Sequence, residues 1–111
     1  MKITQQQRGQ ARVLAPDGPV TGADSDALAK RLEDALQAET KTIIFDATKV
    51  SLLDSRALEA LLDATEQLIR TGHSLKIAGA NETVREVLEI TELAPLFEQF
   101  DDLNAAMEAL V

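Results

Sequence analysis

The chain has 111 residues, with 11 Lys and Arg against 19 Asp and Glu, which gives a formal net charge of −8 at pH 7. Its 45% hydrophobic and 27% charged residues suit one globular domain, residues 1–111, and not a disordered chain. The acidic surface would repel a phosphate backbone, which excludes nucleic-acid binding. A partner with a basic surface is favoured instead. No apolar run is long enough for direct membrane insertion, and the absence of cysteine excludes disulfide and thiolate chemistry.

The opening segment is expected to form a β-hairpin. Residues Lys2 to Ala15 mix β-branched and polar side chains around Arg8-Gly9-Gln10, which puts the turn near Gly9. Proline and glycine in residues 16–19 then break the strand pattern. The start of the chain has no apolar stretch that could act as a secretory signal, so we expect a cytoplasmic protein.

A helix and a buried strand are expected next. The run Thr21-Gly22-Ala23-Asp24-Ser25 offers cap residues, and a helically spaced apolar stripe ending near Ala38 follows it, formed by Leu28, Leu32, Ala35 and Leu36. The nearly continuous apolar run Thr42–Asp46 lies between two helical patterns, which is typical of a strand buried on both faces. We therefore expect this strand near the centre of the sheet.

The second half of the chain continues the alternation. A second helix is expected up to Gly72, with one stripe formed by Leu58, Leu61, Leu62, Thr65, Leu68 and Ile69. The strand Ser74–Ala78 follows, and then a third helix capped by Asn81, with Val84, Val87, Leu88 and Thr91 on one face. The last elements are a weak strand over Leu96–Phe100 and a helix capped by Asp101-Asp102 that carries Leu103, Met107 and Leu110. This order predicts an α/β domain with a mixed β-sheet, parallel inner strands and helices mainly on one face.

Enzyme motifs are absent from the sequence. The one histidine, His73, lies in a turn where a solvated imidazole is the simplest interpretation, and a single histidine cannot complete an HExxH or Cys/His metal set. Neither a G-x-S-x-G elbow nor a G-x-x-x-x-G-K-[ST] loop occurs. The acidic pairs Glu33-Asp34 and Asp101-Asp102 are explained by solvated faces. We therefore expect no catalytic residue, no metal site and no cofactor.

One segment differs from ordinary core patterning. The buried strand ends at Asp46, a loop follows, and Asp54-Ser55 opens the long second helix. A hydroxyl group would then lie beside free backbone N–H groups at a helix N-terminus, where a phosphate would meet the positive end of the helix dipole. The position of Asp54 and Ser55 at the start of this helix is also explained if one of them is simply its N-cap residue.

The same segment resembles a known family. The pattern that carries the resemblance is Ile43-Ile44-Phe45-Asp46-x-x-x-Val50-x-x-Leu53-Asp54-Ser55-x-x-Leu58-x-x-Leu61-Leu62, which is similar to the signature of the STAS domain of bacterial anti-sigma factor antagonists and sulfate-transporter tails. The strand Leu75-Lys76-Ile77 and the helix Thr83–Leu93 fit as well, and the likeness runs from about Val20 to Leu110. The resemblance implies the STAS fold for the whole chain.

In antagonists of that family, the serine after the aspartate is phosphorylated by a partner that is both anti-sigma factor and serine kinase. The resemblance thus implies a non-enzymatic partner-switching protein in transcription regulation, with Ser55 as phosphoacceptor and a serine phosphatase restoring the unphosphorylated form. Asp54, Ser55, Arg56 and Thr21 are the expected partner-binding residues, with the loop Gly18–Ala23 beside them. The alternative is a phosphorylation-independent scaffold or accessory subunit of a transporter, lipid-transfer or signalling complex.

The chain departs from the family pattern at three positions. Arg56 and Ala57 follow Asp54-Ser55 where the family has Ser or Thr and then Gly, and Thr21 replaces an aspartate that commonly precedes the first helix. Arg56 places a cation beside the acceptor, where it can pair with a phosphate or obstruct a kinase. We expect the methyl group of Ala57 to restrict the partner's approach to the helix start.

Overall fold

A five-stranded mixed sheet forms the centre of the protein in the computed structural model, which describes residues 2–38 and 42–110. The strands lie in the order β1 (Ile3–Arg8), β2 (Ala11–Pro16), β3 (Thr42–Asp46), β4 (Ser74–Ala78) and β5 (Glu98–Phe100). The pair β1–β2 is antiparallel and the other pairs are parallel. The predicted hairpin is confirmed, since its turn includes Gly9 at a positive φ of 59°.

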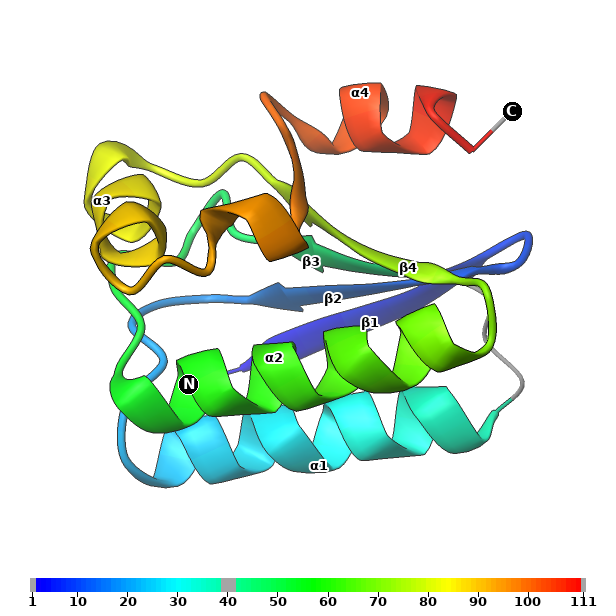
Figure 1. Ribbon diagram of the computed structural model, residues 1–111. Coiled ribbons are helices and arrows are strands. Elements are labelled where there is room, and N and C mark those ends of the chain that lie inside the picture. The colour runs from blue at the N-terminus through cyan, green and yellow to red at the C-terminus, as the bar shows by residue number, and fades with distance from the viewer. Residues whose placement is uncertain (1, 39–41, 111) are drawn as a thin grey trace.

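Three helices cover one face of the sheet and a fourth covers the other. They are α1 (Ala23–Gln37), α2 (Ser55–Arg70) and α3 (Glu82–Ile90) on the first face and α4 (Leu103–Glu108) on the second. Figure 1 shows α1 and α2 side by side beneath the sheet and α4 on the opposite side. The predicted α/β class, the parallel inner strands and the unequal distribution of helices are thus confirmed. None of the helices in residues 2–38 and 42–110 combines the length and apolarity needed to cross a membrane.

The central strand is buried on both faces, as the sequence predicts. Ile43, Ile44 and Phe45 of β3 are all 0% exposed. Ile43 and Phe45 belong to the core beneath α1, α2 and α3, whereas Ile44 belongs to the smaller core beneath α4. This division follows from the alternation of side chains along a strand, and it explains why the run is almost continuously apolar.

The helix stripes form most of this core, with a few differences from expectation. The buried leucines of α1 and α2 are Leu28, Leu32, Leu58, Leu61 and Leu68. Ile69 belongs to the stripe expected on α2 but is 56% exposed, because it follows Leu68 directly and one residue of helix rotates it away from the sheet. Thr91 is the exposed C-cap residue of α3, and Leu110 lies beyond the end of α4 and is 37% exposed.

The element ends also differ in two places. Asn81 and Asp102 cap α3 and α4 as predicted, each accepting a backbone N–H bond. The N-cap of α1 is Gly22, which belongs to the expected cap segment, but it lies at φ 57° and no side chain makes a cap hydrogen bond there. The expected strand Leu96–Phe100 is shorter, because Pro95 belongs to the 3₁₀ turn η1 (Ala94–Leu96) and β5 begins after it.

Candidate functional site

The predicted site lies where the segments that precede α1 and α2 meet. Val20 and Leu53 form an isolated parallel bridge. The Val20 N–H donates to the Leu52 carbonyl at 3.0 Å, and the Asp54 N–H donates to the Val20 carbonyl at 3.1 Å. These backbone bonds hold the starts of α1 and α2 side by side at the carboxyl edge of the strands, so the expected border with the loop Gly18–Ala23 is found.

Asp54 is the polar centre of this junction. As the N-cap of α2, its Oδ1 accepts the Ala57 N–H at 2.9 Å. The same oxygen accepts the Ser25 hydroxyl at 2.6 Å, and Oδ2 accepts the Gly22 N–H at 2.8 Å. The carboxylate therefore caps one helix and binds the first turn of the other, which makes it a tie between α1 and α2 as well as a cap.

The same hydrogen bonds keep Asp54 ionised. The Ser25 hydroxyl, followed by the Ala57 and Gly22 N–H groups, stabilises the carboxylate and holds the pKa of Asp54 below its ordinary value, while the nearby Arg56 guanidinium adds a smaller effect. Asp54 is therefore a charged hydrogen-bond acceptor at neutral pH, and its oxygens are engaged with α1 and α2.

Ser55 has a different environment. It is the first residue of α2 and is exposed, and its hydroxyl has no hydrogen-bond partner among residues 2–38 and 42–110. Within the same described ranges, the backbone N–H groups of Ser55 and Arg56 also make no hydrogen bond. The hydroxyl thus lies in solvent beside two free donors at the positive end of a 16-residue helix.

The other residues singled out in the sequence differ in their surroundings. The Arg56 guanidinium pairs with Asp26 of α1, Nη1 to Oδ2 at 3.3 Å. Thr21 is half-buried just before Gly22, and its carbonyl accepts the Asp24 N–H at 3.1 Å. Ala57 is 0% exposed, so the expectation that its methyl group would meet a partner is wrong: the side chain packs inside the core.

Two residues of the junction were not recognised in the sequence. Ser25 belongs to the expected cap segment, yet it lies inside α1, is 1% exposed and donates to Asp54. A signal was present, because Ser25 falls on the same helical stripe as Leu28 and Leu32. The sequence contains no such signal for the ion pair between Asp26 and Arg56, because this pair depends on how α1 and α2 are placed relative to each other.

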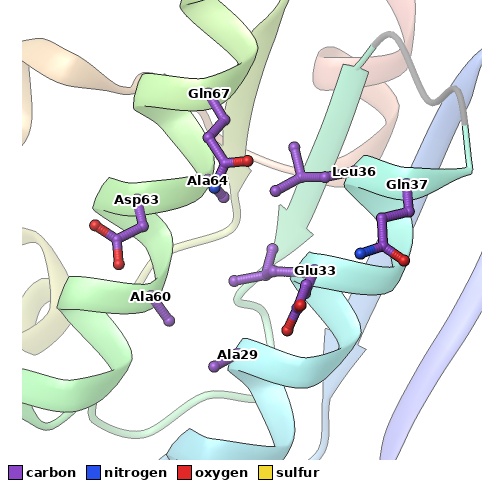
Figure 2. A pocket seen from close by; sticks show the side chains of 9 residues that line it. Ala29, Glu33, Leu36, Gln37, Ala60, Asp63, Ala64 and Gln67 are labelled. Carbon is purple, nitrogen blue, oxygen red and sulfur yellow. The ribbon is translucent and has the colours of Figure 1, made fainter.

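A groove lies further along the same two helices (Figure 2). It has a volume of about 320 Å³ and is hollow because Ala29, Ala60 and Ala64 present only methyl groups to it. Glu33 and Asp63 from the two helices line it as well. Ser55 is not among its lining residues, so the groove and the exposed hydroxyl are separate features of the α1–α2 surface.

Comparisons with known proteins agree with this fold. The sequence pattern of the STAS domain family matches residues 2–106. A Thermotoga maritima protein with the provisional name anti-sigma factor antagonist has a TM-score of 0.90 and 20% identity, with 96% of this chain and 92% of that chain covered. No curated protein matches the sequence.

Two further solved structures extend the likeness. The anti-sigma factor antagonist SpoIIAA of Bacillus, in its unphosphorylated form, has a TM-score of 0.86 and 16% identity, with 98% of this chain and 96% of that chain covered. A sulfate transporter family protein of Wolinella succinogenes has a TM-score of 0.77 and 18% identity, with 92% and 85% covered. At these identities the structures establish a shared fold, and together with the sequence match they show that the chain belongs to the STAS domain family.

Proposed function

We propose that this STAS domain is a cytoplasmic protein-binding switch of the anti-sigma factor antagonist type, controlled by phosphorylation of Ser55. The observation that carries the proposal is the contrast between Asp54 and Ser55. Asp54 is held by three hydrogen bonds, whereas the adjacent Ser55 hydroxyl is exposed and has no partner within the described residues. A rigid helix start thus presents a free hydroxyl to a partner.

The partner in this proposal is an anti-sigma factor that is also a serine kinase. The Ser55 oxygen attacks the γ-phosphorus of ATP, so that an O–P bond forms at Ser55, the bond between the β,γ-bridging oxygen and the γ-phosphorus breaks, and ADP leaves. The hydroxyl proton passes to a base of the kinase, because the Asp54 carboxylate is already engaged with α1 and α2. The STAS domain itself supplies the acceptor and the docking surface and needs no cofactor.

The proposed docking surface comprises Thr21, Asp54, Ser55 and Arg56. A phosphate adds a charge of about −1.5 to −2 to this surface, which disfavours a partner face fitted to the neutral hydroxyl. A serine phosphatase would reverse the change. The existence of SpoIIAA structures in unphosphorylated and phosphorylated forms supports a switch of this kind on the same fold.

The test is phosphorylation by a candidate anti-sigma factor kinase from the same organism. Incubation with that kinase and magnesium ATP should add one phosphate, measured by intact mass, and Ser55→Ala should abolish it. Ser51→Ala is the matched control, because Ser51 is an exposed serine in the loop before α2 and its loss should change nothing. A phosphate that persists in Ser55→Ala would contradict the proposed site.

The alternative function is a phosphorylation-independent scaffold within a transporter or signalling complex. The likeness to the sulfate transporter family protein supports it, because the same fold occurs there. Under this alternative, Asp54 still caps α2 and Ser55 is an ordinary surface residue. Tight binding of the kinase without modification of Ser55 would favour the scaffold over the switch.

A further inference from the structure

We infer that a phosphate on Ser55 draws the Arg56 guanidinium away from Asp26, so that modification of α2 also uncovers a carboxylate on α1. This inference rests on the proposed phosphorylation of Ser55. It concerns residues outside the Asp-Ser pair itself, and Arg56 is a position where this chain departs from the pattern of its family.

The Arg56–Asp26 pair is suited to such an exchange because it is weak. Its N–O distance is 3.3 Å, and the two side chains are 64% and 68% exposed. Exposed pairs of this type contribute little to stability, because water and salt screen them and two long side chains must be ordered. The exposed Arg56 side chain can therefore turn about its own bonds without giving up buried contacts.

A phosphate on Ser55 would be the stronger partner for Arg56. It carries close to two negative charges and three acceptor oxygens, and it can bind a guanidinium through two parallel hydrogen bonds. The free N–H groups of Ser55 and Arg56 would hold it at the positive end of α2. The carboxylates at this junction, those of Asp26 and Asp54, cannot neutralise it, and repulsion between the phosphate and Asp26 also favours the exchange.

The exchange would spread the effect of one modification over two helices. In the unphosphorylated protein, Arg56 and Asp26 neutralise each other across the α1–α2 junction. After the exchange, Arg56 offsets part of the phosphate charge, and Asp26 presents an unpaired carboxylate on α1. A partner that contacts both helix starts would then meet added negative charge at two points.

The experiment installs phosphoserine at position 55 during translation, so that it does not depend on any kinase. Phosphorus NMR then follows the second ionisation of the phosphate with pH. Arg56→Gln should raise this pKa by about 0.5, the size expected for loss of one exposed ion pair. Arg70→Gln is the matched control, because it removes the same charge from the last turn of the same helix and should leave the pKa unchanged.

A second readout follows the arginine itself. In the phosphorylated protein, the Arg56 Nε–H signal should move with the ionisation of the phosphate, as expected if the two groups are paired. A phosphate pKa that is equal in wild type and Arg56→Gln, together with an Arg56 signal indifferent to phosphate ionisation, would overturn the exchange. That result would leave the proposed switch intact, whereas failure of the kinase to modify Ser55 would count against the switch and not against the pairing.

Discussion

The two faces of the sheet are built differently. The face beneath α1, α2 and α3 is a continuous apolar core. The face beneath α4 has a small core, formed by Ala11, Val13, Ile44, Ala78 and Ala106, and beside it a buried cation. Lys76 is 5% exposed, with Nζ 3.0 Å from Glu98 Oε1 and 5.4 Å from the centre of the Phe100 ring.

Because of this difference, the two faces contribute unequally to the stability of the protein and to the placement of the proposed docking surface. The large apolar face fixes α1 and α2, and the proposed docking surface is located where those two helices begin. The α4 face contributes less apolar burial and lies on the other side of the sheet. We therefore expect damage beneath α2 to affect both the fold and the docking surface, and damage beneath α4 to have a smaller effect.

The largest expected effect is that of Leu61→Ala. Leu61 is 0% exposed beneath α2, and the cavity left by the truncated side chain should cost about 2 to 5 kcal/mol of unfolding free energy. Met107→Ala on α4 should cost less, since Met107 is only half-buried. Urea denaturation of both variants measures the difference, and equal losses would contradict the unequal contribution of the two faces.

A pH-dependent effect is expected at Asp54. Its pKa is lower in the folded protein than in the unfolded chain, so the stability from its carboxylate is complete above the unfolded value of about 3.9 and is lost as the pH falls toward the folded pKa. Asp54→Asn removes this contribution.

The measurement is the free energy of unfolding of both proteins at a series of pH values. The advantage of wild type over Asp54→Asn should be constant near neutral pH and should shrink once the pH falls below about 4. Ser25→Ala should reduce that shrinkage, because it removes the strongest of the hydrogen bonds that lower the pKa. An advantage that stays constant down to low pH would show that the pKa of Asp54 is the same in the folded and unfolded protein, so that its hydrogen bonds do not favour the ionised form.

A smaller effect is expected for Lys76→Met on the α4 face. Methionine keeps most of the length and apolar contact of lysine, while Glu98, with a side chain that is 58% exposed, remains solvated without its partner. The change should alter stability by less than about 1 kcal/mol in either direction, because the cost of burying a charge offsets much of the ion-pair energy. A loss comparable to that of Leu61→Ala would show that the ion pair is essential to this face.

The smallest effect is expected for Ser55→Ala. Because the hydroxyl is exposed and makes no hydrogen bond within the described residues, its removal should change the unfolding free energy by no more than about 0.5 kcal/mol. Thermal unfolding of the purified variant tests this. A strongly destabilised Ser55→Ala would mean that Ser55 has a structural role, which would weaken its assignment as a free acceptor.

The fold could be predicted from the sequence because its signals are local. The apolar run of β3, the stripe of α2 and the caps Asn81 and Asp102 each follow from side-chain spacing or from short hydrogen bonds. The position of Asp54-Ser55 at a helix start was also local. The interhelix contacts were not, since the bonds of Asp54 to Ser25 and of Arg56 to Asp26 depend on how α1 and α2 pack.

The most direct test of the proposed switch compares the affinity of the proposed partner, an anti-sigma factor that is also a serine kinase, for two forms of the protein. One form is unmodified and the other carries phosphoserine at position 55, and both are measured by calorimetry at the same salt concentration. The account predicts that the unmodified form binds at least about tenfold more tightly, because the added charge lies within the docking surface. Equal affinities for the two forms would contradict it.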